Sequence, residues 1–223
     1  MSKKNKTVEV NEFDQTIAAS KSFFEKYQKQ IVYGGSAILA IVIAALLINQ
    51  FYIVPRNEKA NEALYPAEQL MRNGQFEKAL NGEGETLGFI AVADKYGCTK
   101  AANLANLYAG ICYAETGKYQ EAVDMLGKFD NCDDEMISPS TIGLLANCYA
   151  QLNQPEKAIE NFLLAAKKAD NNLLSPIYLI QAGELYEAKG EKEKALNCYT
   201  QIKEKYQQSL QYGEIDKYIE RLK

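Results

Sequence analysis

The 223-residue sequence contains no histidine and no tryptophan, and it has only 5 prolines and 14 glycines. The absence of histidine excludes imidazole acid–base catalysis, a Ser-His-Asp triad and His-ligated metals. The low proline and glycine counts exclude collagen-like and low-complexity chains. The sequence also lacks a phosphate-cradling glycine loop, a nucleophile elbow and the ligand spacing of a zinc site. We therefore expect no enzymatic activity, no cofactor and no metal.

Acidic residues outnumber basic residues by 29 to 25, which gives a net charge of −4. Residues 1–30 carry six bases and four acids, so the remaining residues carry 19 bases and 25 acids, a net −6. An acidic main segment argues against nucleic-acid binding. A catalytic pair of carboxylates stays open at this point, although acids scattered over helix faces are ordinarily solvated.

One long stretch of the sequence carries no charge. It lies between Lys29 and Arg56 and is almost wholly apolar, and it is longer than the roughly 20 residues that a helix needs to cross a bilayer. One alternative is a buried core helix, but such helices rarely stay uncharged over so many residues. The other is a cleaved signal peptide, but its apolar region normally comes after only a short basic segment at the N-terminus. We predict a transmembrane helix over residues 31–54. Its small residues offer a surface for contact with another helix: Gly34, Gly35 and Ser36.

The lysines on either side of this helix predict its orientation. Six lysines precede the apolar stretch, whereas only Arg56 and Lys59 follow it closely. Positive charge favours the cytoplasmic side of a membrane. We expect a single-pass protein of the bacterial inner (plasma) membrane, with a cytoplasmic N-terminus and a periplasmic main domain.

Five cysteines are present, and none forms a Cys-x-x-Cys pair: Cys98, Cys112, Cys132, Cys148 and Cys198. An odd count leaves at least one free thiol in an exported domain. Three of the five lie in apolar helical patterns and are predicted to be small core residues. A disulfide is the alternative, and a thiol-based redox protein using Cys98 or Cys132 is a more remote one.

The sequence after residue 101 repeats itself three times. Each copy has a pair of small residues, a tyrosine three positions later, a turn residue, and an alanine five positions after the turn. The turn residues are Gly117, Asn153 and Gly190, which are 36 and 37 positions apart. Because Gly and Asn readily adopt the left-handed conformation that ends a helix, each copy is predicted to be a helical hairpin. A lone hairpin cannot bury its apolar face, so the hairpins must stack. The other shared positions are Ala109-Gly110, Leu145-Ala146 and Ala182-Gly183, then Tyr113, Tyr149 and Tyr186, then Ala122, Ala158 and Ala195.

This pattern resembles the tetratricopeptide repeat. Phe162 and Tyr199 match the aromatic residue of that family four positions after the alanine, whereas Leu126 departs from it. A degenerate unit precedes the three clear ones: it has a turn at Gly74, an interruption at residues 81–85 and a helix that resumes at about residues 87–96. The loops over residues 130–139 and 170–176 lengthen the period beyond the family's nominal 34.

The predicted fold is therefore all-α: one transmembrane helix followed by a tetratricopeptide-repeat solenoid. We assign residues 1–30 to a cytoplasmic tail, 31–54 to the membrane helix, and 55–101 to a linker helix and the degenerate first repeat with its insert. Residues 102–203 form three tetratricopeptide repeats. Residues 204–223 form a C-terminal capping helix with an apolar stripe, the cap that a solenoid needs for solubility: Ile215, Tyr218, Ile219 and Leu222.

The resemblance implies a binding groove, because the first helix of each tetratricopeptide hairpin lines the concave face. This places ten residues in a peptide-binding groove: Leu107, Tyr108, Ile111, Glu115, Leu144, Asn147, Gln151, Gln181, Glu184 and Glu187. The set is apolar and acidic without lysine or arginine, so it departs from the basic clamp that some family members use for peptide carboxylates. It suits peptide segments with apolar anchors. The alternative is that these residues only face solvent.

The acidic cluster over residues 130–135 is predicted to be a solvated loop. A calcium site is the alternative, but the cluster lacks the alternating ligands and the central glycine of an EF-hand loop.

A narrower resemblance concerns the whole arrangement, over roughly residues 20–223. The insert Asn81-Gly82-Glu83-Gly84 and the segment Tyr108 to Tyr113 are similar to Bacteroidetes versions of the ancillary SecYEG translocon subunit, the YfgM-like type. This resemblance implies a scaffold whose partners are translocon subunits, exported clients or periplasmic chaperones. A cell-envelope or division scaffold that acts by self-association is the alternative, and the sequence leaves the oligomeric state open.

Overall fold

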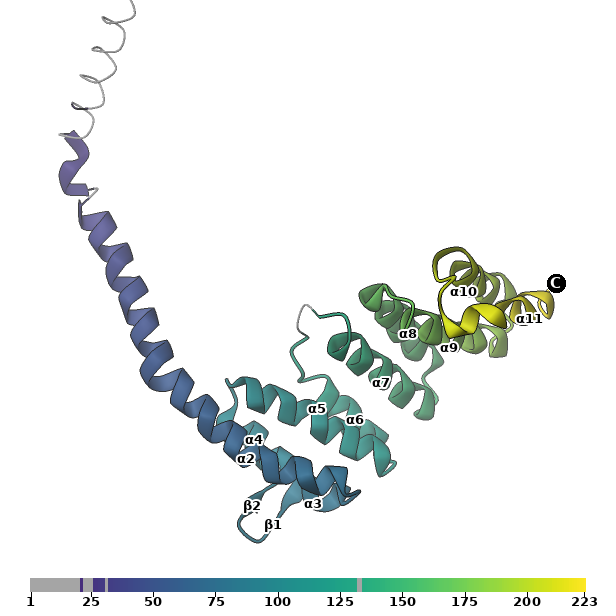
Figure 1. Cartoon of the computed structure of the whole chain (residues 1–223), viewed down its shortest axis with the longest axis horizontal. Coiled ribbons are helices and arrows are strands. Elements are labelled where there is room, and N and C mark those ends of the chain that lie inside the picture. Colours follow the sequence, from purple (N-terminus) through teal and green to yellow (C-terminus); the bar gives the residue numbers. More distant parts are fainter. Residues whose placement is uncertain (1–20, 22–25, 31, 132–133) are drawn as a thin grey trace, which may run out of the picture. The chain divides into compact units, whose positions relative to one another are not determined.

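The computed structural model describes residues 21, 26–30, 32–131 and 134–223 (Figure 1). The chain divides into two compact units, residues 1–55 and residues 56–223. Most of the predicted cytoplasmic tail lies outside the described residues, and so does Cys132.

The described residues contain one helix that is long and apolar enough to cross a membrane, Lys26–Arg72. Its large apolar side chains between residues 32 and 54 are all exposed, and none of the described residues in that span is buried. A π-helical turn, η1 (Asn49–Ile53), interrupts the regular geometry at the end of the apolar span. The prediction of one apolar N-terminal helix is confirmed.

The second unit is built from helical hairpins, which follow one another along the chain (Figure 1). The three regular hairpins are α5 (Lys100–Glu115) with α6 (Tyr119–Leu126), α7 (Ile137–Gln151) with α8 (Pro155–Ala169), and α9 (Ser175–Ala188) with α10 (Lys192–Lys205). An irregular hairpin, α2 (Val54–Arg72) with α3 (Phe76–Asn81), precedes them. The all-α fold class is confirmed.

The turn of every hairpin has the same geometry. Gly74, Gly117, Asn153 and Gly190 have φ values of 72°, 74°, 56° and 77°. In each turn the residue after this one donates its N–H to a carbonyl five positions earlier, which closes the first helix in a Schellman motif. The predicted left-handed turn residues are confirmed, and asparagine tolerates at position 153 the conformation that glycine adopts elsewhere.

The predicted small residues mark places where helices approach closely. A Cβ added to Gly110 would lie 2.5 Å from Cδ2 of Leu126, and one added to Gly183 would lie 2.4 Å from the Tyr199 ring. In the second hairpin Ala146 holds the corresponding position and is fully buried. A further glycine, Gly143, lies under the ring of Tyr178, whose nearest atom would be 2.3 Å from an added Cβ. It makes room on α7 for the Tyr178 side chain of α9.

The insert after α3 forms a small β-hairpin. Strands β1 (Gly82–Glu83) and β2 (Thr86–Leu87) pair antiparallel, and helix α4 (Phe89–Tyr96) follows. The helix predicted over about residues 87–96 is present and ends at Tyr96, but it begins at Phe89 because Leu87 belongs to β2 and Gly88 is extended. The sequence pattern showed only an interruption, since strands of two residues are too short to alternate.

The first helices of the regular hairpins begin at side-chain caps. The Thr99 hydroxyl accepts the N–H of Ala102 at the start of α5, and the Asn171 side chain accepts the N–H groups of Leu173 and Leu174 before α9. The Asp134 carboxylate accepts three consecutive N–H groups at the start of α7: Met136, Ile137 and Ser138. The predicted loop over residues 130–139 is therefore too long, because this cap starts α7 at Ile137. Pro139 is tolerated in that first turn, where its missing N–H costs little.

The C-terminal segment contains a 3-10 turn, η2 (Leu210–Gly213), and helix α11 (Ile215–Glu220). Ile215 is buried against the core of the last two hairpins, and the rest of the apolar stripe packs against the same core: Tyr218, Ile219 and Leu222. This segment covers apolar surface that the last hairpin would otherwise expose.

Candidate functional site

An apolar cavity of about 340 Å³ lies between the first helices of two neighbouring hairpins, α5 and α7. Its lining includes Leu107 and Ile111 from α5 and Leu144 from α7, three of the ten residues predicted for the groove. The lining also includes Met136 and the first turn of α7: Ile137, Ser140 and Thr141. Among the residues that the structure describes, no charged side chain lines this cavity. It is an open apolar surface suited to receiving a side chain from another molecule.

Helical spacing explains why these residues share one wall. Leu107 and Ile111 are four positions apart on α5, and Ile137, Thr141 and Leu144 follow at intervals of four and three on α7. Thr141 donates its hydroxyl to the Ile137 carbonyl at 2.8 Å, so its polar group is satisfied within the helix. Met136 and Ile137 remain 46% and 50% exposed. The rim of the cavity is therefore apolar and open to solvent.

Sequence reasoning missed Met136 and Ile137 because it placed residues 130–139 in a loop, and it missed Ser140 and Thr141 because the predicted groove set on this helix began at Leu144. Their spacing to Leu144 carries the helical signal. This spacing can be recognised as helical only when the start of the helix is placed directly after the Asp134 cap. The pKa of Asp134 is lowered, first by the hydrogen bond from the Ser138 hydroxyl and then by the backbone N–H groups, with burial opposing. Asp134 thus acts as a helix cap.

Other predicted groove residues have structural roles. Tyr108 stacks at a tilt on Phe89 of α4, with ring centroids 5.4 Å apart, and is half-buried. Burial opposes ionisation of Glu187, but hydrogen bonds from Arg221 and Tyr199 hold the pKa of its carboxyl below its usual range. Glu187 therefore joins α9 to α10 and to the C-terminal segment.

The remaining predicted residues are polar and lie along the first helices without a shared cavity. Four of them are exposed: Glu115, Asn147, Gln151 and Glu184. Gln181 on α9 is different, because its Oε1 atom is buried and has no hydrogen-bond partner among the described residues. An unpaired buried acceptor costs free energy unless a donor reaches it.

The hairpin geometry agrees with comparisons against known proteins. The profile of the tetratricopeptide repeat-like domain family matches residues 21–218 of this chain. The chain belongs to this family. RNA polymerase-associated protein CTR9 of Saccharomyces cerevisiae is 25% identical over 211 residues, which cover 87% of this chain. The chain spans only 18% of the length of that yeast protein.

Tetratricopeptide repeat-like domains generally mediate protein–protein interaction and are typically non-catalytic. The family assignment therefore supports a binding role for the open surfaces of the hairpins, and the α5–α7 cavity is the one that sequence and geometry both indicate.

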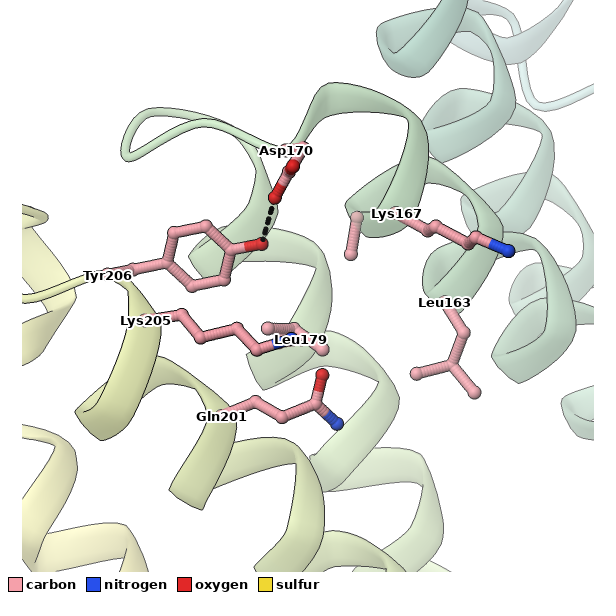
Figure 2. A pocket seen from close by; sticks show the side chains of 8 residues that line it. Leu163, Lys167, Asp170, Leu179, Gln201, Lys205 and Tyr206 are labelled. Atoms are coloured by element: carbon pink, nitrogen blue, oxygen red, sulfur yellow. Dashed lines mark hydrogen bonds between the residues drawn. The ribbon is translucent and has the colours of Figure 1, made fainter.

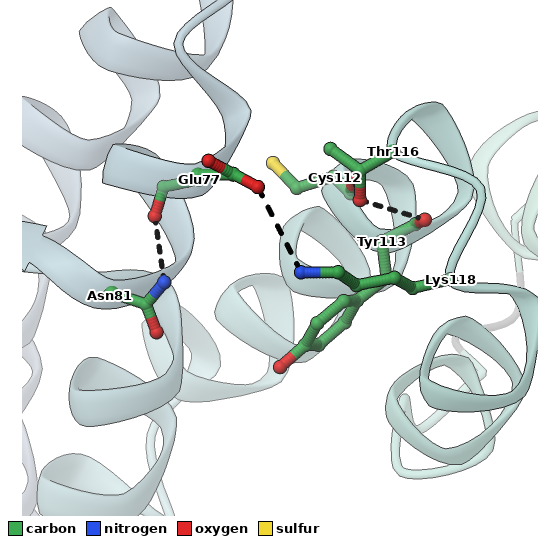
Figure 3. Close-up of polar contacts among 6 residues, drawn as sticks. All are labelled: Glu77, Asn81, Cys112, Tyr113, Thr116 and Lys118. Carbon is green, nitrogen blue, oxygen red and sulfur yellow. Dashed lines mark hydrogen bonds and ion pairs between the residues drawn. The ribbon is translucent and has the colours of Figure 1, made fainter.

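Three cysteines of the tetratricopeptide repeat-like domain lie in its core. Cys112, Cys148 and Cys198 are free and buried, whereas Cys98 is free and exposed. Figure 3 shows Cys112 near the contact between α3 and the turn that follows α5. In this contact Lys118 of the turn faces Glu77 of α3, with an Nζ–Oε1 distance of 4.0 Å. Burial, and to a lesser extent Glu115, raises the pKa of the Cys112 thiol to about 12. Burial also raises the thiol pKa of Cys148 and of Cys198 to about 11. These three thiols stay protonated at neutral pH and are poor nucleophiles.

Proposed function

We propose that this chain is a non-enzymatic, membrane-anchored scaffold that holds protein segments in the α5–α7 cavity. The observation that carries the proposal is this cavity, which has an uncharged apolar lining on the first helices of adjacent hairpins. Its partners would be subunits of the Sec translocon, exported clients or periplasmic chaperones, as the YfgM-like resemblance implies.

The apolar helix supports the anchoring part of the proposal. Exposed isoleucine, leucine, valine and aromatic side chains cover the helix between residues 32 and 54. A bilayer would remove this surface from water at a gain of roughly 25 cal/mol per Å². The six preceding lysines favour a cytoplasmic N-terminus, so the hairpins would lie in the periplasm of a bacterial cell.

A translocon helix would find a place to pack on the same anchor. Gly34 and Gly35 have open space where a side chain would begin. The Ser36 hydroxyl donates to the Tyr33 carbonyl at 3.0 Å, so its hydrogen bond is satisfied within the helix. Small residues of this kind allow two helix backbones to approach closely in a membrane.

The chemistry of the first helices suggests what the bound segment looks like. An aliphatic or aromatic side chain would fill the α5–α7 cavity. Exposed acids at Glu115 and Glu184 would favour a segment with basic flanks.

A membrane-impermeant, amine-reactive crosslinker added to intact spheroplasts tests the proposal in one experiment. The hairpin lysines react only if the domain lies outside the cytoplasm, and the recovered adducts identify the partner. We expect crosslinks to a translocon subunit, an exported client or a chaperone. The double variant Met136→Ser/Ile137→Ser should lower their yield roughly tenfold, because it removes apolar anchor surface.

Leu164→Ser is the matched control for this experiment. Leu164 is 45% exposed on α8, and it does not line the cavity. Its variant should crosslink like the natural protein. An unmodified hairpin domain would reject the orientation. Crosslinks that join only copies of this chain would favour a self-associating envelope scaffold instead.

A further inference from the structure

A second cavity of about 510 Å³ lies between the second helices of two hairpins, α8 and α10 (Figure 2). Its apolar part comes from Leu163 and Ala166 of α8 and from Leu179 of α9. None of the ten predicted groove residues lines it. The cavity has the size of an ordinary ligand site.

A hydrogen bond ties the two helices together at one end of this cavity. The Tyr206 hydroxyl donates to Asp170 Oδ1 at 3.1 Å (Figure 2). Asp170 ends α8 in the left-handed conformation, with φ 41°, and Tyr206 is buried directly after α10. This hydrogen bond joins the ends of the two helices. It also occupies one oxygen of Asp170, the one carboxylate in the lining.

The two lysines that line this cavity are not paired with its carboxylate, Asp170. Lys205 and Gln201 extend from α10 into the space between the helices, whereas Lys167 lies on the α8 side with its ammonium group turned away (Figure 2). Neither lysine forms an ion pair with any residue in the part of the chain that the structure describes. Lys203, two positions before Lys205, pairs instead with Asp216 at 2.6 Å.

A neighbouring cavity on the same helices provides the contrast. It has a volume of about 340 Å³, and Leu163 lines both cavities. Its cations are neutralised within the chain, because Lys189 contacts Glu156 and Glu191 at 2.8 Å and 3.1 Å, and Lys194 contacts Glu191 at 2.6 Å. Of these two cavities, only the larger is lined by lysines that form no ion pair among the described residues. The lining of the larger cavity carries two lysines and one aspartate, so a positive charge is left over beside an aliphatic floor.

We propose that the α8–α10 cavity is a second binding site, which takes a peptide segment with an aliphatic side chain next to an aspartate or glutamate. The aliphatic group would lie on Leu163 and Leu179. The carboxylate would face Lys205, with Lys167 able to swing in on its flexible stem. The Gln201 amide would bond the peptide backbone. A peptide fits better than a compact solute because the shared Leu163 extends the floor into the neighbouring cavity. This proposal does not rest on the function proposed for the α5–α7 cavity.

The test uses the full chain in a non-ionic detergent and three fluorescein-labelled peptides. The peptides are Gly-Ser-Leu-Glu-Leu-Ser-Gly and its versions with Gln or Lys in place of Glu. We expect the Glu peptide to bind more tightly than the Gln peptide by roughly threefold, as for a solvent-exposed ion pair, and the difference to shrink at high salt. Lys205→Ala should abolish the difference, and Lys205→Glu should reverse the preference toward the Lys peptide.

Two control variants locate the effect. Lys168→Ala removes an exposed lysine of α8 that does not line the cavity, and it should leave the Glu preference unchanged. Ile137→Ser alters the α5–α7 cavity and should also leave it unchanged. Equal binding of the Glu and Gln peptides, or no binding of any of the three, would overturn the proposal. Loss of the preference in Ile137→Ser but not in Lys205→Ala would move the site to the other cavity and overturn it too.

Discussion

The α5–α7 cavity and the α8–α10 cavity are lined by different chemistry on the same architecture. Within the described part of the chain, the first has no charged residue in its lining, whereas the second has Lys167, Asp170 and Lys205. Neither cavity is lined by the residues that define the repeat, which are the turn glycine or asparagine, the alanine five positions after it and the tyrosine three positions after the small pair. The repeat residues therefore set the positions of the helices that enclose each cavity. The residues between them determine which ligand each cavity can bind.

The largest expected effect comes from filling the contacts that set the helix spacing. Gly143→Ala and Gly183→Ala would each place a Cβ within 2.4 Å of a tyrosine ring. An alanine in an exposed helix is normally more stable than glycine by up to about 1 kcal/mol. Here we expect a loss of about 1–3 kcal/mol from overpacking, measured by urea unfolding of the full chain in detergent.

Gly213→Ala is the control for both substitutions, because nothing lies within 4 Å of the position of its Cβ. Its stability should stay close to that of the natural protein. If Gly143→Ala or Gly183→Ala also left stability unchanged, close packing at these glycines would not be what positions the helices around the two cavities.

A smaller effect is expected from the helix cap beside the α5–α7 cavity. Asp134→Ala removes the cap that starts α7 and should cost about 1 kcal/mol at pH 7. Because the folded-state pKa of Asp134 is lowered, its contribution is complete above the ordinary aspartate pKa of about 4 and is lost as the pH falls through the lowered value. The stability difference between the natural protein and the variant should therefore shrink between about pH 5 and pH 2.

Glu135→Ala tests whether that effect belongs to the cap. Glu135 is exposed, and its carboxylate takes no part in the cap, which uses only Asp134 oxygens. Urea midpoints of this variant should follow those of the natural protein across the same pH range. A difference between Asp134→Ala and the natural protein that did not vary with pH would rule out the capping explanation.

The smallest effect concerns the α8–α10 cavity. Tyr206→Phe removes the hydroxyl that bonds Asp170 and should lower stability by about 0.5 kcal/mol. The same substitution in an Asp170→Gly background should cost less, since the acceptor is already gone and glycine keeps the left-handed turn. Equal costs in the two backgrounds would show that this hydrogen bond does not hold the cavity.

Sequence reasoning located the features that depend on local backbone physics. The left-handed turns at Gly117, Asn153 and Gly190 could be predicted because few residue types tolerate positive φ. The small residues at helix crossings could be predicted because they recur at a fixed distance from each turn. Three residues of the α5–α7 cavity came from the family pattern on the same basis.

The rest of the candidate sites depends on contacts between distant residues. An aspartate that caps a helix looks like an aspartate in a solvated loop, so the start of α7 and its cavity residues were missed. Lys203 and Lys205 are likewise equivalent in sequence. Only the position of Asp216 on α11 pairs one of them and leaves the other unpaired.

The caps of neighbouring hairpins are also joined to each other. The Asn171 amide, which starts α9, donates to the Glu135 carbonyl beside the Asp134 cap at 3.2 Å. We therefore expect fraying at the start of α7 to weaken the start of α9 as well, so that the two helix starts unfold locally together. A partner that seats its side chain against Ile137 would suppress this fraying, and its binding would stiffen a hairpin that it does not touch.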